Sequence, residues 1–271
     1  MDRRQFMGLG GVAAAFSAAS AAEAATLAVA GKSVIDFGVT PGASSDQSAA
    51  MQEAIDSLAA AGQPIIIPAG HYRVARLQLP SKSTVLGVPG LTVLIAQPGL
   101  SAFESLNAQD ISLRGIAFAG TGLVARGCRN LSVCDCQVLS SAGDGIVCAG
   151  DGLFIAGNRA SSCAKAAIWV EGDAMVTGNS VTGPGQFGLR LGGVERLGTL
   201  TVMNNMIKGT AIGIAASNSD NGYAFIAMNM ISGAAKGGIR ALMGDELIGK
   251  DLSHAGSEAF RNLEIAANVS V

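Results

Sequence analysis

Short apolar stretches with a regular internal alternation recur along the chain from about residue 110 onward. In each unit, apolar residues stand five and three positions before a shared position, and in all but the last unit another stands two positions after it. Alternate residues of a strand point to the same side, so this spacing predicts a strand that buries one face. The shared position, here termed the ladder position, is occupied by Cys136, Asn158, Asn179, Asn205, Asn229 and Asn268.

A second apolar strand follows each ladder position after a short loop. It begins at Gly145-Ile146, Ala167-Ile168, Gly188-Leu189, Gly213-Ile214 and Gly238-Ile239. The units leave no room for a helix, and their spacing is not that of a leucine-rich repeat. We therefore expect an all-β fold, a single-stranded right-handed parallel β-helix whose coils stack about 4.8 Å apart. Repeated Asn at an inward bend predicts a structural ladder, because each amide can donate to one coil and accept from the next.

The segment before the repeats has a different pattern. Met51, Ala54, Ile55 and Leu58 form one apolar stripe of a helix, which we expect Asp46 to cap, and an Ile65–Ile67 strand follows. Gly62 is placed to end the helix at C′. The sequence thus predicts a capping segment over 33–74, with an N-terminal helix that closes the first coil, and repeat coils over 75–271.

Three motifs in this segment carry a resemblance. They are Asp36-Phe37-Gly38, the Ser-rich helix start from Ser44 to Ile55, and Pro68-Ala69-Gly70-His71-Tyr72-Arg73-Val74. Together they resemble the N-terminal segment of pectate-lyase-like right-handed parallel β-helix proteins. The resemblance implies the fold and does not imply an activity.

The first 30 residues read as an export signal. Arg3-Arg4 precede an Ala/Gly-rich apolar run, and small-residue cleavage patterns follow near Ala22 and Ala28. This resembles a twin-arginine signal peptide, which predicts the twin-arginine export machinery as a partner and a periplasmic location, with no membrane attachment after cleavage. A Sec signal or an amphipathic helix is the alternative. We expect the remainder, 31–271, to be one domain.

Composition narrows the functional classes. The 271 residues include 37 Gly, and the formal net charge is −2, so we expect no nucleic-acid partner.

The leader, the capping segment and the Asn/Gly repeats together resemble a family of twin-arginine-translocated, uncharacterised repeat proteins. That family has no assigned activity, so the resemblance carries over no catalytic residue.

The second strand of each coil offers candidate chemistry on its outer side. If its flanking apolar residues point inward, then Val147, Trp169, Arg190, Ala215 and Arg240 form one outward file. Trp169 could stack on a sugar ring, and Arg190 and Arg240 could bind uronate carboxylates. Alternatively, the arginine stems cover an apolar sheet face and Trp169 packs under a loop.

The catalytic prediction is a polysaccharide lyase, if the protein is an enzyme at all. Elimination needs a base and a cation beside the carboxylate, for which Arg190 and Arg240 are the candidates, with Lys165, Lys236 or His254 nearby. The Asn-Thr-Asp stretch and Asp-Asp pair of related hydrolases do not occur. We expect no cofactor and no metal.

Other polar residues have simpler interpretations. Asp144, Glu171 and Asp173 are spread over separate coils, which favours solvated turn charges over a calcium site. His71 is interpreted as a surface residue, and the charged insertion from Met243 to Arg261 as a surface loop.

The five cysteines lie between residues 128 and 163 without metal-site spacing. We interpret them as small buried side chains. The spacing of Cys134 and Cys136 predicts that both point to the same face of one strand.

Two functions follow from these patterns. The first is an exported protein that binds an acidic polysaccharide, and cleaves it if it is an enzyme. The alternative is a non-catalytic scaffold of the cell envelope. A groove with converging groups beside the outward file would favour the first, and scattered charges would favour the second.

Overall fold

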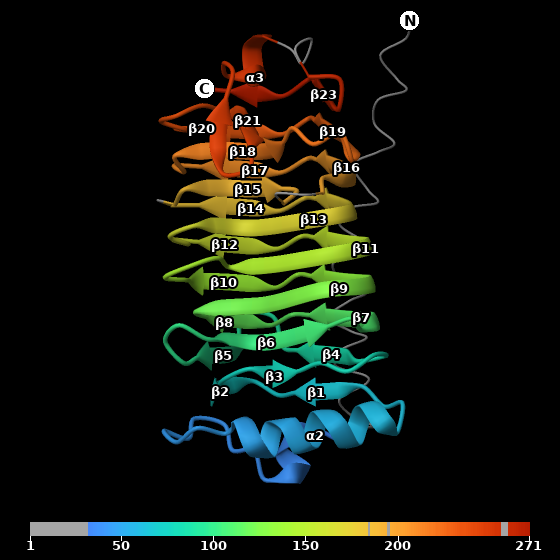
Figure 1. The fold of residues 1–271 in the computed structure, drawn as a ribbon. Coiled ribbons are helices and arrows are strands. Elements are labelled where there is room, and N and C mark those ends of the chain that lie inside the picture. Colours follow the sequence, from blue (N-terminus) through green and yellow to red (C-terminus); the bar gives the residue numbers. More distant parts are fainter. Residues whose placement is uncertain (1–31, 184, 194–195, 256–259) are drawn as a thin grey trace, which may run out of the picture.

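The strands stack in parallel into a right-handed β-helix of about 8 turns, as the sequence predicts (Figure 1). The computed structural model describes residues 32–183, 185–193, 196–255 and 260–271. Each coil contributes strands to three faces, which we number in chain order. The first and second faces belong to one 15-stranded sheet, and the third face is a separate 9-stranded sheet.

Three long strands bend across the first and second faces: β9 (Thr121–Cys134), β11 (Ile146–Ala156) and β13 (Ala166–Thr177). The first face also contains β3 (Leu77–Gln78), β6 (Ser101–Leu106), β15 (Phe187–Leu191), β18 (Ile212–Ser217) and β21 (Ile239–Met243). The second face also contains β1 (Ile65–Ile67), β4 (Thr84–Gly87), β7 (Gln109–Arg114), β16 (Gly198–Met203), β19 (Gly222–Ala227) and β23 (Leu263–Ala266).

The third face is made of short strands, which from β10 onward follow the ladder positions. It contains β2 (Gly70–Val74), β5 (Thr92–Ala96), β8 (Ala117–Ala119), β10 (Gln137–Ser140), β12 (Arg159–Ser161), β14 (Ser180–Thr182), β17 (Met206–Lys208), β20 (Met230–Ser232) and β24 (Val269–Ser270). Every pairing in this sheet is parallel, and the only register shift among these pairings of described residues lies between Val138 and Ser140.

The predicted asparagine ladder is present and buried. Asn158, Asn179, Asn205 and Asn229 are at most 1% exposed, and Asn268 ends the stack half-buried. The Oδ1 atom of Asn179 accepts from both the backbone N–H and the Nδ2 of Asn158, each at 3.0 Å. Its Nδ2 donates to the carbonyl of Ile155 at 2.9 Å and to Oδ1 of Asn205 at 3.0 Å. Each amide therefore satisfies polar groups that the bend removes from the strand ladders.

The bend itself is made by the residue before each ladder position, which adopts a left-handed conformation. Gly157 and Gly178 have φ of 66° and 65°, and Asp135, Met228 and Ala267 have φ of 53°, 54° and 52°. A left-handed residue at 135 turns the chain between Cys134 and Cys136. The prediction that both cysteines point to one face is wrong for this reason: Cys136 is buried in the core, whereas Cys134 is half-exposed.

The other cysteines are buried thiols, as expected. Cys128, Cys136, Cys148 and Cys163 are at most 4% exposed, and the described residues hold no disulfide. Burial raises the pKa of Cys136 and of Cys163 to about 12, so these thiols stay protonated and pack as small apolar groups.

A stack of glycines forms the corner between the first and second faces. Gly150, Gly172, Gly198 and Gly222 lie in successive coils, and a Cβ on Gly172 would lie 1.9 Å from the carbonyl oxygen of Gly150. The backbones approach too closely for any side chain, and φ of Gly172 is +101°. Glycine is therefore required at this corner on both steric and conformational grounds.

The N-terminal end is closed by α2 (Ser48–Ala60), which follows the 3₁₀ helix η1 (Val34–Phe37) (Figure 1). The predicted stripe of α2 is buried against the first coil, and Gly62 follows the helix with φ of +64°. The prediction that Asp46 is the N-cap is wrong by one residue, since Gln47 occupies that position; Asp46 accepts instead from the N–H of Ser48 at 3.1 Å. None of the helices in the described ranges is long and apolar enough to cross a membrane.

The charged insertion is more than a surface loop, contrary to the prediction. It forms β22 (Glu246–Ile248), which pairs antiparallel with β21, and α3 (Leu252–Ala255). Leu252 is 4% exposed within the main core, and Ile248 and Phe260 pack against that core. The insertion therefore covers apolar surface that the last coils would otherwise leave in contact with solvent.

Removing one ladder amide should destabilise the fold strongly. Asn179→Ala deletes four hydrogen bonds: it removes the acceptor of the buried N–H of Asn158 and a donor to the carbonyl of Ile155, whereas Oδ1 of Asn205 keeps the backbone N–H of residue 179. We expect a loss of about 3 kcal/mol or more in the free energy of unfolding, measured by urea denaturation. Asn218→Ala, outside the ladder, is the control. Equal stability of the two variants would show that the ladder contributes nothing to stability.

Candidate functional site

The predicted outward file exists in the register expected from the sequence. Strand pairing places Val147 opposite Trp169, Trp169 opposite Arg190, Arg190 opposite Ala215 and Ala215 opposite Arg240. The same file continues toward the N-terminus through Val124, Glu104 and Gln78. The flanking residues such as Ile168 and Val170 are buried in the core, as predicted. Side chains about twenty residues apart in sequence are thus immediate neighbours.

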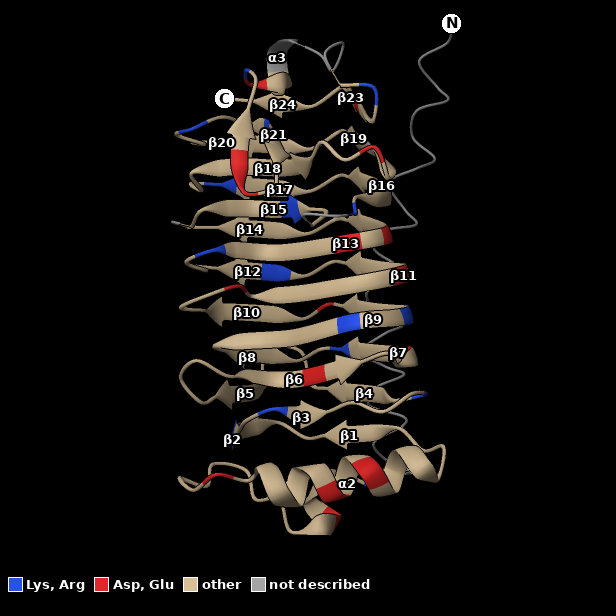
Figure 2. Ribbon diagram, viewed as in Figure 1, with Lys and Arg blue, Asp and Glu red and all other residues tan. Residues whose placement is uncertain are grey.

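The file is the floor of a groove made of three adjoining hollows. The first, of about 260 Å³, runs from Arg76 and Glu104 to Trp169. The second shares Asp144 and Trp169 with the first, and the third shares Gln186, Phe187 and Asp245 with the second. The groove therefore follows the axis of the β-helix across successive coils. Figure 2 shows that charged residues are sparse on the strands but include members of β6, β9 and β15 on this face.

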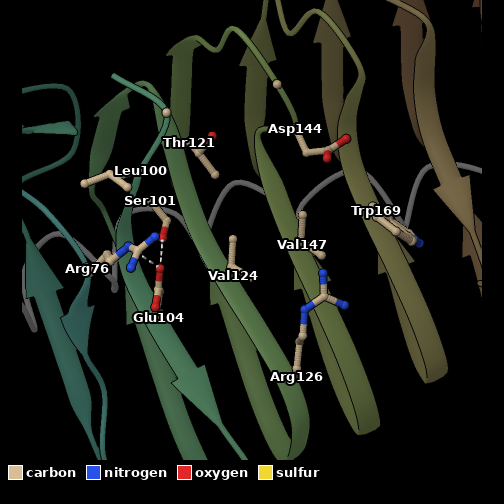
Figure 3. A pocket seen from close by; sticks show the side chains of 12 residues that line it. Arg76, Leu100, Ser101, Glu104, Thr121, Val124, Arg126, Asp144, Val147 and Trp169 are labelled. Carbon is tan, nitrogen blue, oxygen red and sulfur yellow. Dashed lines mark hydrogen bonds and ion pairs between the residues drawn. The ribbon is translucent and has the colours of Figure 1, made fainter. Parts of the chain in front are cut away.

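The first hollow has an apolar floor and polar walls (Figure 3). Val124 and Val147 lie in the middle, with Asp144 on one side and Arg126 on the other. An ion pair closes the N-terminal side, where Nε of Arg76 lies 3.5 Å from Glu104 and Oγ of Ser101 donates to the same carboxylate at 2.8 Å. Trp169 bounds the opposite side.

Trp169 is half-buried and carries a cation over its ring. The guanidinium carbon of Arg190 lies 4.5 Å from the ring centroid and that of Arg126 lies 5.9 Å from it. The indole N–H donates to the carbonyl of Gly192 at 3.0 Å, which fixes the ring orientation. Trp169 also packs against a second apolar cluster outside the core, made of Ala166, Phe187, Ile212, Ala215 and Leu242. Part of the ring surface is therefore covered, and its remaining surface lines two hollows.

Arg190 is bound by the hairpin of the insertion. Its Nη2 donates to Oδ1 of Asp245 at 2.5 Å, and only 13% of its side chain is exposed, against 78% for Asp245. Its Nε is buried and has no hydrogen-bond partner among the described residues. Arg190 thus lines the groove, but its charge is already matched by a carboxylate.

Arg240 has a different environment from Arg190. Nη1 donates to the carbonyl of Lys236 at 2.8 Å and Nη2 donates to the carbonyl of Gly249 at 3.0 Å. These bonds tie the strand β21 to the chain that follows β22. Arg240 does not line any of the three hollows described above, although the strand register places it in the same file as Trp169 and Arg190.

Arg126 is a site residue that the repeat pattern did not indicate. It lies on β9 two residues after Val124, on the same outward side, and is exposed. Its side chain makes no hydrogen bond or ion pair to any residue within the described ranges, and its guanidinium lies over the ring of Trp169. On β9, Ala125 points inward, and Val124 and Arg126 point outward. This alternation could have indicated Arg126 only if the position of the bend in β9 had been known.

The remaining polar candidates do not converge. Oδ1 of Asp144 accepts from the N–H of Ala166 at 2.9 Å, and Oδ1 of Asp173 accepts from the N–H of Thr199 at 2.8 Å. Glu171 lies on β13 at the corner between faces, and His254 falls in α3. No group of three potential metal ligands comes together within the part of the chain that the structure describes. His71 is exposed on β2, as the sequence predicted.

The cations Lys165 and Lys236 line the rim of the groove. Lys165 is exposed beside Trp169 and Arg190, and its side chain makes no ion pair to a described residue. Lys236 lies beside Asp245 and Glu246 in the third hollow. Arg126, Lys165 and Lys236 are therefore groove cations that form no ion pair with a described carboxylate.

Stacked coils, a capping helix and an axial groove define a pectate-lyase-like parallel β-helix. The family model described as rhamnogalacturonase A/epimerase, pectate lyase-like, matches residues 32–259. The chain therefore belongs to this family. A search of curated proteins gives no match to the chain.

Solved structures agree on the fold. The A-module of mannuronan C-5 epimerase AlgE6 from Azotobacter vinelandii is 17% identical, with a TM-score of 0.52, covering 89% of this chain and 87% of that one. A family 28 exopolygalacturonase from Yersinia enterocolitica is 14% identical, with a TM-score of 0.54 and coverage of 88% and 65%. An iota-carrageenase complexed to iota-carrageenan fragments is 16% identical, with a TM-score of 0.59 and coverage of 78% and 56%. At these identities the likeness concerns the fold alone.

Substitution should distinguish Arg240, which stabilises the fold, from Arg126, whose side chain forms no ion pair. Arg240→Met removes the donors of two backbone carbonyls, and we expect the free energy of unfolding to fall by about 2 kcal/mol. Arg126→Met should change it by no more than about 0.5 kcal/mol, because Arg126 is exposed and unpaired. Urea denaturation measures both. If Arg240→Met is as stable as the wild type, the guanidinium does not hold the hairpin.

Proposed function

We propose that this protein binds an acidic polysaccharide along the groove of the first face. The observation that carries the proposal is Trp169 with two guanidinium groups over or beside its ring, in a groove that spans several coils. Arg126 supplies a cation with no carboxylate partner, so it is free to pair with a uronate or sulfate group. The remaining ring surface of Trp169 supplies apolar contact for a sugar.

The shape of the groove supports a chain ligand over a small molecule. Its hollows adjoin along the axis, and its floor is apolar at Val124 and Val147. Polar walls on both sides, from Asp144 and Arg126, offer hydrogen-bond partners to hydroxyl groups. The named activities of the structural neighbours, which include an exopolygalacturonase and a carrageenase, are consistent with this ligand class.

Binding can be tested directly with polygalacturonate and alginate, with neutral dextran as the control polymer. We expect Arg126→Ala to weaken binding of the acidic polymers about tenfold, because it removes the unmatched cation. Arg190→Ala and Trp169→Ala should also weaken binding. Affinity should fall as salt is added, because the exposed charge of Arg126 is screened.

The matched control is Arg159→Ala, which removes an exposed arginine of the third face. It should leave the affinity unchanged. If no acidic polymer binds, or if Arg159→Ala and Arg126→Ala have the same effect, the groove is not the binding site, and the non-catalytic envelope scaffold becomes the better reading.

Cleavage by elimination is a second candidate, with Arg190 and Arg240 as its predicted catalytic residues. The guanidinium of Arg190 is held by Asp245, and that of Arg240 by backbone carbonyls, so elimination would require the hairpin to shift. Following the absorbance of unsaturated product during incubation with the same polymers separates cleavage from binding alone.

We further propose that the protein acts in the periplasm after export by the twin-arginine machinery. The support is the sequence of residues 1–30, which lie outside the described residues. Replacing both Arg3 and Arg4 with Lys should retain the protein in the cytoplasmic fraction, detected by immunoblot of cell fractions. Unchanged export of this double variant, with a Gln5→Ala variant as control, would argue for a Sec signal.

A further inference from the structure

The tip of the β21–β22 hairpin places a carboxylate against an arginine of the groove. Met243 pairs with Glu246, so the turn consists of Gly244 and Asp245. Oδ1 of Asp245 accepts from Nη2 of Arg190 at 2.5 Å, although Arg190 belongs to β15, which is two strands away from β21. The contact lies in the hollow that Trp169 also lines, so the groove carries an anion of its own near the indole ring.

This ion pair leaves Arg190 with unused hydrogen-bond donors. Within the described residues, Nη2 alone donates to a partner, and Nε is buried without one. A guanidinium and a carboxylate pair most strongly through two parallel N–H···O bonds, whereas a single such bond joins Arg190 to Asp245. A carboxylate that engaged two donors would therefore bind Arg190 more tightly than Asp245 does.

The two partners of the ion pair differ in how easily each can give up the other. Asp245 keeps 78% of its side chain exposed, so its carboxylate can return to water at little cost. The side chain of Arg190 is only 13% exposed, and its guanidinium carbon lies 4.5 Å from the centroid of the Trp169 ring. A buried guanidinium without an anion is costly, so whatever replaces Asp245 has to bring a negative charge.

The tip of the hairpin has few other anchors. Among the described residues, Asp245 is the member of 243–247 whose side chain forms a hydrogen bond or ion pair, and most of the tip is exposed. A hollow of about 380 Å³ lies beside the tip, which is therefore not tightly packed on that side. The base is held independently, by the buried Leu242 and by the bond from Arg240 to Gly249. The tip can give way without disturbing the base.

We propose that Asp245 is an internal competitor for the ligand: it occupies the carboxylate position on Arg190, and an acidic sugar binds beside Trp169 by displacing it. This proposal rests on the function proposed above. Arg126 forms no ion pair with a described residue and can bind an acidic group at once, whereas Arg190 becomes available only to a ligand that brings a replacement anion. The contact favours charged polysaccharides over neutral ones, because a neutral sugar leaves Asp245 in place.

Two matched variants of the hairpin tip test the competition. Asp245→Asn keeps the shape of the side chain and removes its charge, so Arg190 is left without an anion until the ligand supplies one. We expect its affinity for polygalacturonate to rise about tenfold, measured by isothermal titration calorimetry with neutral dextran as the control polymer. Glu246→Gln removes the same charge from the neighbouring exposed position and should raise the affinity by no more than about twofold.

The results distinguish failure of the competition from failure of binding. Equal affinities of Asp245→Asn and Glu246→Gln overturn the competition and leave polysaccharide binding intact. If neither the wild type nor Asp245→Asn binds any acidic polymer, the proposed function falls as well. Binding that appears only in Asp245→Asn supports both proposals.

An Arg190→Met background shows whether the effect passes through Arg190. Without the guanidinium, Asp245 has nothing to occupy, so Asp245→Asn should change the affinity by less than about twofold in that background. A gain of about tenfold that persists without Arg190 overturns the proposal, because Asp245 would then act by general repulsion. Trp169 is the only tryptophan of the chain, so its fluorescence during urea denaturation checks that each variant retains a folded site.

Hydrogen exchange on the wild-type protein is a test that needs no substitution. Displacement of Asp245 releases the tip, so we expect the amides of 244–247 to exchange at least about threefold faster when polygalacturonate is bound. The amides of α2, at the opposite end of the β-helix (Figure 1), are the control and should not change. Unchanged or slower exchange in the tip overturns the proposal, even if both hairpin variants fail to fold.

Discussion

From Cys136 to Asn268 the structure depends on the buried hydrogen bonds that join successive coils at the asparagine ladder. Parallel pairing alone would leave the polar groups of each bend unsatisfied, and burying an amide without a partner costs a few kcal/mol. One amide serves two coils, since Asn179 accepts from Asn158 and donates to Asn205. The ladder therefore fixes the rotation of each coil relative to its neighbours as well as its distance from them.

The register set by this constraint creates the site. Trp169 and Arg190 are 21 residues apart in sequence and become direct neighbours because their strands pair without a shift. A shift of one residue in either strand would turn the outward side chain of that strand inward. The chemistry of the outer face is thus a consequence of the ladder, although no ladder residue lies in the groove.

The periodic part of the molecule could be predicted from the sequence, and the aperiodic part could not. The ladder, the inward files and the outward file follow from spacing, because every coil has the same surroundings. The path of the insertion does not repeat, so its hairpin could not be placed over Arg190 or its helix against the core. The left-handed residue at Asp135 was hidden for a related reason: glycine signals this conformation at Gly157 and Gly178, whereas Asp, Met and Ala do not. Arg126 was missed because a bend within the long strand β9 decides which of its residues face outward.

The glycine corner has a consequence for the entropy of binding. Backbone lies directly on backbone at Gly150, Gly172, Gly198 and Gly222, with no side chain that could change rotamer between coils. The corner adjoins the first face, so the sheet that carries the groove is bounded on one side by backbone that has almost no freedom to lose. A ligand in the groove therefore meets a rigid sheet, and the conformational entropy lost on association falls mainly on the ligand and on the long side chains of the walls.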